Sequence, residues 1–247
     1  MSSKALVLCL IVLPLARAIA APNADAVEKP VYYECAKVKG GKYADKECSK
    51  AAESKSEEKY ELEPGGGKGK AFRGNAKGKV TIFIPHFSYE MTCGSATEDE
   101  GVVAANGASL EQVVIRFSGC DNGCGSGKGE IVTTPLKGEL GVLSGAKVGV
   151  LLSPESGEKV AEYGCGGDEA FVTYGSILAE VVGGVNVFSK EQTLVFTVNG
   201  HHEQEWTRFE GALEEEVLKT EINGSGRESQ GVQQEITQKG EFLNLKT

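Results

Sequence analysis

The stretch EQVVIRFSGCDNGC, residues 111–124, carries the pattern that decides the fold. Apolar residues recur at every second position at Val113, Ile115 and Phe117. This is the periodicity of a β-strand with one buried face. Residues 121–123, Asp-Asn-Gly, are typical turn formers and separate Cys120 from Cys124. The stretch therefore predicts a strand that runs into a tight turn.

The same alternation recurs along the chain. It is found in residues 79–84 (KVTIFI), 147–152, 170–174 and 192–198 (QTLVFTV). Many of the 33 glycines lie between such runs and favour turns. One segment, residues 212–219 (ALEEEVLK), is the only helical candidate, and it could equally be the edge of a strand. The sequence predicts an all-β fold, an antiparallel β-sandwich or distorted barrel of ten or more strands.

The N-terminal segment predicts export. Lys4 supplies a positive charge and residues 5–16 are apolar. Ala18 and Ala20 are small residues at the two positions that signal peptidase recognises before its cleavage site. The apolar run is about half of the roughly 20 residues that a membrane span needs. Residues 1–20 are therefore interpreted as a cleaved signal peptide. We expect a secreted mature chain with no membrane span.

The composition of the chain changes near Gly65. A polar, cysteine-bearing segment precedes this point, and a glycine-rich, basic segment follows it. We therefore predict a small N-terminal disulfide-bearing module over residues 31–64 and a main β domain over 65–247. Residues 21–30 are expected to be a flexible lead-in.

The charge of the chain excludes some partners. It has 26 basic and 35 acidic side chains, a net charge of −9. Cleavage after Ala20 removes Lys4 and Arg17, which leaves 24 basic against 35 acidic side chains and a net charge of −11. A strongly acidic exported protein is unsuited to nucleic acid or to anionic lipid surfaces.

Cleavage would remove Cys9 and leave an even number of cysteines. The six that remain are Cys35, Cys48, Cys93, Cys120, Cys124 and Cys165. An even count in an exported chain predicts disulfides, and six cysteines allow fifteen pairings. Short sequence separation favours a disulfide between Cys35 and Cys48 across a hairpin and another between the neighbouring Cys120 and Cys124. Elimination then pairs Cys93 with Cys165.

The cysteines and histidines do not form a metal motif. A structural zinc site usually needs a second close pair of ligands besides Cys120 and Cys124, and the sequence has none. His201 and His202 are adjacent, so on a strand they would point to opposite faces. The spacing of a calcium loop counted from Asp121 also fails. We expect no metal and no cofactor.

The sequence contains no motif that assigns a catalytic residue. The chain has no Gly-x-Ser-x-Gly elbow, and in residues 201–206 (HHEQEW) a tryptophan occupies the place of the second zincin histidine. Acidic runs at residues 98–100, 168–169 and 214–216 leave open a glycosidase-like pair of carboxylates. A hydrolase of an extracellular polymer is therefore the alternative function.

Aromatic side chains supply the candidates for ligand binding. Trp206 is the single tryptophan, and aromatic rings can line a sugar-binding face, although in β proteins they more often pack in the core. The candidates are Trp206, His201 and Tyr174, with Tyr60, Tyr89 and Tyr163 as further tyrosines.

Several blocks carry a resemblance to known sequences. They are YYECAKV, FSGCDNGC, GEIVTTPLKGELGVL, KVGVLLSP and AEYGCGG. In this order they resemble a group of uncharacterised secreted, cysteine-containing β-rich proteins of soil actinobacteria. The resemblance covers most of the mature chain and implies export and a cysteine-stabilised β fold. It implies no activity and no catalytic residues.

These observations together predict a non-enzymatic binding or structural component of the cell envelope or extracellular space. The expected partner is an envelope or extracellular ligand, a glycan or a protein.

Overall fold

The computed structural model describes residues 28–65, 69–125 and 129–247. The predicted signal peptide, residues 1–20, and most of the lead-in at 21–30 lie outside the described residues. None of the helical segments within the described ranges is long and apolar enough to cross a membrane.

The all-β class predicted from the sequence is confirmed. The first strands are β1 (Val31–Lys37), β2 (Tyr60–Pro64), β3 (Lys70–Ala76), β4 (Val80–Ile84), β5 (Tyr89–Val103), β6 (Ser109–Val113), β7 (Ile115–Cys120), β8 (Glu130–Val132) and β9 (Leu136–Leu143). The next are β10 (Lys147–Pro154), β11 (Lys159–Cys165), β12 (Glu169–Gly175), β13 (Ile177–Val182), β14 (Phe188–Phe196), β15 (Leu218–Ile222), β16 (Glu228–Ser229) and β17 (Gly231–Lys246). The short 3₁₀ turns η2 (Pro85–Phe87) and η3 (Asp121–Gly123) join strands.

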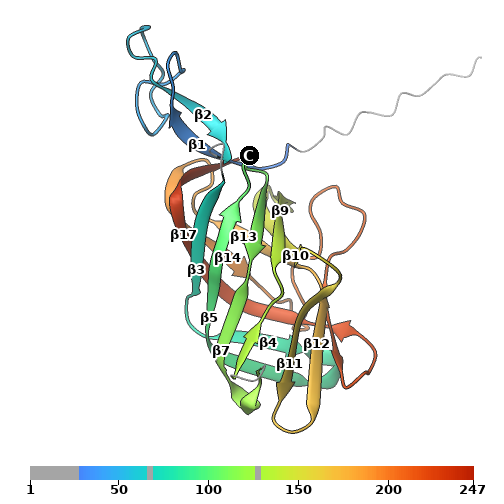
Figure 1. The fold of residues 1–247 in the computed structure, drawn as a ribbon. Helices are drawn as coiled ribbons and strands as arrows, with labels where there is room; N and C mark the ends of the chain where they lie inside the picture. Colours follow the sequence, from blue (N-terminus) through green and yellow to red (C-terminus); the bar gives the residue numbers. More distant parts are fainter. Residues whose placement is uncertain (1–27, 66–68, 126–128) are drawn as a thin grey trace, which may run out of the picture.

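The main sheet closes on itself as a distorted antiparallel barrel. From β17 the ladder runs through β14, β13, β10, β9 and β6 to β5. It returns to β17 through β3 and β4, each of which pairs with both of these long strands. Figure 1 shows the long strands inclined around one interior. Closure pairs the edges that an open sheet would expose.

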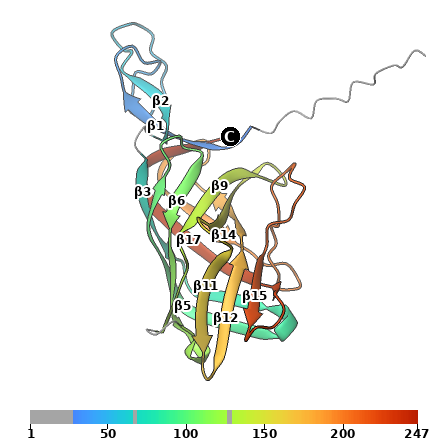
Figure 2. The same ribbon diagram turned by 45° about the vertical axis from the view of Figure 1, so that its right-hand side comes forward.

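A second sheet, in the order β11-β12-β15-β16, packs against one end of the barrel. It lies at the end away from the β1–β2 hairpin (Figure 2). The buried side chains Val160, Tyr163, Phe171 and Leu218 of this sheet belong to the same hydrophobic core as the barrel. The sheet and the barrel therefore share one interior.

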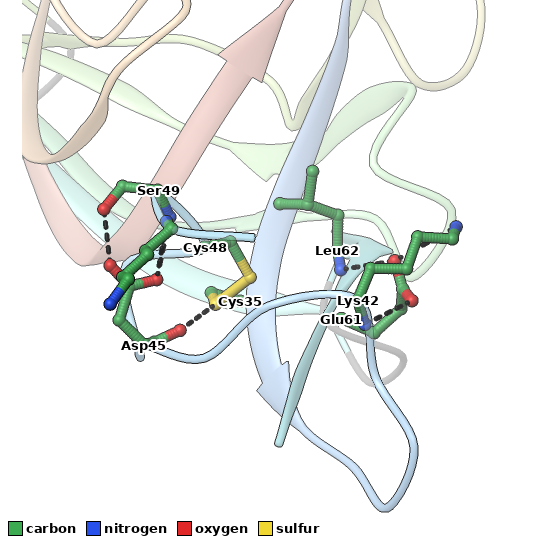
Figure 3. Close-up of a disulfide and its surroundings, with 8 residues drawn as sticks. Cys35, Lys42, Asp45, Cys48, Ser49, Glu61 and Leu62 are labelled. Atoms are coloured by element: carbon green, nitrogen blue, oxygen red, sulfur yellow. Dashed lines mark hydrogen bonds and ion pairs between the residues drawn. A yellow bond between two sulfur atoms is a disulfide. The ribbon is translucent and has the colours of Figure 1, made fainter. Parts of the chain in front are cut away.

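The β1–β2 hairpin projects from the opposite end (Figures 1 and 2). Cys35 in β1 forms a disulfide with Cys48 in the connecting loop. Asp45 fixes this loop, because its carboxylate accepts hydrogen bonds from the backbone and hydroxyl of Ser49 (Figure 3). The start of β1 also pairs with the end of β17. The division into residues 31–64 and 65–247 stays a prediction.

The predicted strand at residues 111–117 is two strands. Val113 ends β6 and Ile115 begins β7, and both strands pair with the long β5. Gln112 has a left-handed backbone with φ of 57°, and the register between β6 and β9 shifts at this point. The predicted buried face is confirmed, because Val113, Ile115 and Phe117 are all buried.

The helical candidate at residues 212–219 is wrong. No helix forms there, and the segment is irregular until β15 begins at Leu218. Leu213 is 94 % exposed, whereas Leu218 is buried in the core. Leu213 and Val217 would share one face of a helix, but Leu213 stays exposed to solvent, so this face is not buried.

Candidate functional site

The disulfide pairing differs from the prediction at two of three bonds. Cys35–Cys48 is confirmed. The other bonds join Cys93 to Cys120 and Cys124 to Cys165, so the predicted Cys120–Cys124 and Cys93–Cys165 pairs are wrong.

Strand pairing explains the two corrected bonds. Cys93 lies directly opposite Cys120 in the ladder between β5 and β7. The turn η3 then redirects the chain, and a bridge between Gly125 and Gly164 brings the next cysteine to β11. The Cys93–Cys120 bond therefore lies inside the barrel wall, and the Cys124–Cys165 bond ties the second sheet to the barrel.

A cavity of about 50 Å³ lies between the barrel and the second sheet. Its walls are mainly aliphatic and aromatic, with Ile131, Leu136 and Phe196 from the barrel side and Val160 and Leu218 from the second sheet. No charged side chain is among the described residues that line it. Apolar walls with a few polar groups are typical of small-molecule sites.

One polar cluster at this cavity is internally satisfied. The hydroxyls of Thr173 and Thr220 lie 3.1 Å apart, and both donate to Oε1 of Gln230. The Thr133 hydroxyl accepts a hydrogen bond of 2.9 Å from the backbone of Ile115. These hydrogen bonds fix neighbouring strands to one another.

Two further polar atoms at the cavity have no partner among the described residues. They are the hydroxyl of Tyr163 and Oε1 of Gln234. Thr173 lies close enough to influence the pKa of Tyr163, but no hydrogen bond of normal geometry joins them. An unpaired buried polar group costs about 1–3 kcal/mol. Something with complementary hydrogen-bonding groups is therefore expected in the cavity.

Ring stacking holds the Tyr163 side chain in place, and Gln234 is buried on the inward face of β17. The Tyr163 ring stacks on Phe171 with 5.3 Å between centroids and an interplanar angle of 8°. Burial raises the pKa of the Tyr163 hydroxyl, so it stays neutral and can donate. Gln234 comes from β17, between the inward-facing Val232 and Ile236. The site therefore combines one group from the second sheet with one from the barrel.

The prediction from sequence missed β17, the strand that carries Gln234. Residues 230–238 place every second side chain inward, as Gln230, Val232, Gln234, Ile236 and Gln238. The signal was present, because Val232 and Ile236 recur with the period of a strand. Glutamines interrupt the apolar face, so the segment does not read as a buried strand.

A second buried polar group lies nearer the hairpin end of the barrel. The Tyr32 hydroxyl donates to Gln192 at 2.8 Å, and Gln192 donates to Gln238 at 2.6 Å. The amide of Gln238 donates to both carboxyl oxygens of Glu98, each at 2.8 Å. A side chain at Gly74 would collide with this carboxyl group. The network links β1, β14, β17 and β5.

Burial raises the pKa of Glu98 to about 7, although the hydrogen bond from Gln238 lowers it. Such a shift is typical of a carboxyl group used in catalysis. A glycosidase-like mechanism needs two facing carboxyl groups. The neighbouring Asp99 instead pairs with Arg116 at 3.1 Å on the outer face. No second carboxylate contributes to the pKa of Glu98 among the described residues.

The predicted binding candidates are not brought together. Trp206 packs with Phe209 over the outer barrel wall, and Lys147 Nζ lies 5.2 Å from its ring centroid. His201 is exposed at a turn of the same connection. Tyr174 lies in β12 of the second sheet, with the Arg227 guanidinium 3.7 Å from its ring centroid. Their role in binding stays a prediction.

The described residues contain no group of three or more His, Cys, Asp or Glu side chains placed to hold a metal ion. Comparison with protein-family models, curated proteins and solved structures finds no match. The interpretation of the cavity therefore rests on its own geometry.

Proposed function

We propose that this chain is an exported, non-enzymatic binding protein of the cell envelope or extracellular space, and that its ligand occupies the cavity between the barrel and the second sheet. The observation that carries the proposal is the pair of unpartnered polar atoms at an otherwise apolar cavity. A ligand site needs such groups to orient its guest. The N-terminal sequence and the three disulfides support the exported compartment.

The alternative, a hydrolase with paired carboxylates, receives less support. Glu98 has the raised pKa of a catalytic acid. However, both of its oxygens are engaged by Gln238, and that amide is engaged in turn by Gln192. The group is therefore committed to a structural network, with no partner carboxylate described beside it.

A cavity-filling variant tests the proposed function. Ala161 lines the cavity, and Ala161→Val adds two methyl groups to this wall. Ala71→Val makes the same change at an exposed position of β3 and is the matched control. The oxidised mature chain is titrated with a panel of small neutral molecules and followed by NMR.

We expect saturable binding of at least one panel member at a single site. Ala161→Val should weaken this binding at least tenfold, and Ala71→Val should change it by less than twofold. Absence of binding, or binding that Ala161→Val leaves unchanged, would contradict the proposal.

A further inference from the structure

The size of the cavity limits its guest. A water molecule needs about 10–15 Å³ of such space, so a cavity of about 50 Å³ holds roughly three to five positions of this size. The ligand, or the part of it that enters, therefore has about four non-hydrogen atoms.

The walls limit its charge. No charged side chain is among the described lining residues, and the polar groups that line the cavity are hydroxyls and amides. Burying an ion without an opposite charge is strongly unfavourable. The guest is therefore neutral.

The two unpartnered atoms specify the guest's hydrogen-bonding groups. Oε1 of Gln234 can only accept, so the guest must donate to it. The Tyr163 hydroxyl stays protonated and can donate, so the guest should also present an acceptor. A carboxamide carries an N–H donor and a carbonyl acceptor on one carbon atom.

We infer that the cavity binds a small neutral molecule of the carboxamide class, with its N–H group donating to Gln234 Oε1 and its carbonyl accepting from the Tyr163 hydroxyl. This inference rests on the proposed function and deepens it, because it names the ligand chemistry of the same site. The rival occupant is ordered water, which could satisfy the same atoms.

Three probes of similar size separate these possibilities. Acetamide carries both a donor and an acceptor, acetone carries an acceptor alone, and 2-propanol carries a hydroxyl group. Each is titrated into the ¹⁵N-labelled, oxidised mature chain and followed by NMR. Acetamide should bind at least tenfold more tightly than acetone.

Two variants from different sheets remove the proposed partners. Tyr163→Phe and Gln234→Leu should each weaken acetamide binding at least fivefold and change acetone binding by less than twofold. Thr193→Val, which removes a hydroxyl outside the cavity, is the control and should have no effect on either probe. The acetamide-to-acetone ratio of the unaltered chain tests the inference even where one variant fails to fold.

The outcomes distinguish failure of the carboxamide inference from failure of the proposed function. Equal binding of acetamide and acetone that Ala161→Val abolishes would overturn the carboxamide class and leave the proposed function standing. A buried water that acetamide does not displace would also overturn the class. Absence of any binding sensitive to Ala161→Val would overturn the proposed function and the inference together.

Discussion

Glu98 and Tyr163 are buried polar residues at different levels of the same interior, and their surroundings differ. The carboxyl group of Glu98 receives two hydrogen bonds from Gln238, which is itself held by Gln192. The hydroxyl of Tyr163 has no partner among the described residues. The first arrangement makes a buried ionisable group tolerable. The second leaves a group available for a ligand.

Glu98 should make the stability of the protein depend on pH. In the folded protein its pKa is about 7, against an ordinary value of 4.5. Between these pH values the unfolded chain alone loses the proton, so the free energy of unfolding falls as pH rises and becomes level above about pH 7. A shift of this size corresponds to about 3 kcal/mol.

Glu98→Gln should remove this dependence, because the amide stays neutral and can still accept from Gln238. Urea unfolding from pH 4.5 to pH 8 should show the variant more stable than the unaltered chain at pH 8. Asp99→Asn, at the exposed neighbouring position, should change stability by less than about 1 kcal/mol. An unchanged slope with pH in Glu98→Gln would show that Glu98 is not the titrating group.

The connection between β14 and β15 packs closely against one glycine of the barrel wall. Phe209 of this connection lies against Gly141 of β9, where a Cβ atom would be 2.5 Å from the ring. Trp206 and Phe209 pack on Leu143, Leu151 and Leu178. The connection is therefore anchored by side chains on the outer face of the barrel.

Gly141→Ala should displace this connection. We expect a loss of about 1–3 kcal/mol of stability, as for other overpacked sites, and a shift in the emission of Trp206, the only tryptophan in the chain. Gly200→Ala, in the same connection, adds a Cβ atom that meets nothing within 4 Å and is the control. Identical fluorescence in the two variants would contradict the proposed anchoring.

A covalent link joins the second sheet to the barrel. The bond between Cys124 and Cys165 spans a sequence separation of 41, whereas the bond between Cys35 and Cys48 spans 13. In the chain-entropy model, removing the Cys124–Cys165 bond lowers the free energy of unfolding by about 4 kcal/mol, and removing the Cys35–Cys48 bond lowers it by about 3 kcal/mol.

The double variant Cys124→Ala and Cys165→Ala should loosen the second sheet first. Hydrogen exchange should accelerate in β11, β12 and β15 before it does so in β10 or β13. The matched variant Cys35→Ala and Cys48→Ala should accelerate exchange in the hairpin segment alone. Uniform acceleration over the whole chain in the first variant would show that the sheet and barrel open as one unit.

For the whole molecule, the expected form is an exported chain with all six mature cysteines paired. Its N-terminus should be Ala21, and reduction should add six hydrogens to the intact mass. Peptide mapping without reduction should join Cys93 to Cys120 and Cys124 to Cys165. Free thiols in the secreted chain, or a retained N-terminal segment, would contradict this expectation.

Strand periodicity predicted the fold class well because it is a local property. The runs at residues 79–84, 147–152, 170–174 and 192–198 correspond to strands β4, β10, β12 and β14. The buried face at Val113, Ile115 and Phe117 was also predictable. Each of these depends only on which side chains prefer to leave water.

The site could not be predicted in the same way. Tyr163 was one of several tyrosines named as candidates, and Gln234 lies in a strand whose inward face alternates glutamine with aliphatic residues. They meet at one cavity only because β11 belongs to the second sheet and β17 to the barrel.

The sequence by itself determined that this protein is made of strands, that six of its seven cysteines follow the N-terminal segment, and that neighbouring side chains alternate between core and solvent. The tertiary structure alone decided that the main sheet closes into a barrel, that Cys120 and Cys124 bond to different partners, and that an apolar cavity contains two unsatisfied polar atoms. The physical reason is that periodicity and turn chemistry act over a few residues. Sheet closure, disulfide pairing and cavities depend on contacts between segments far apart in the chain.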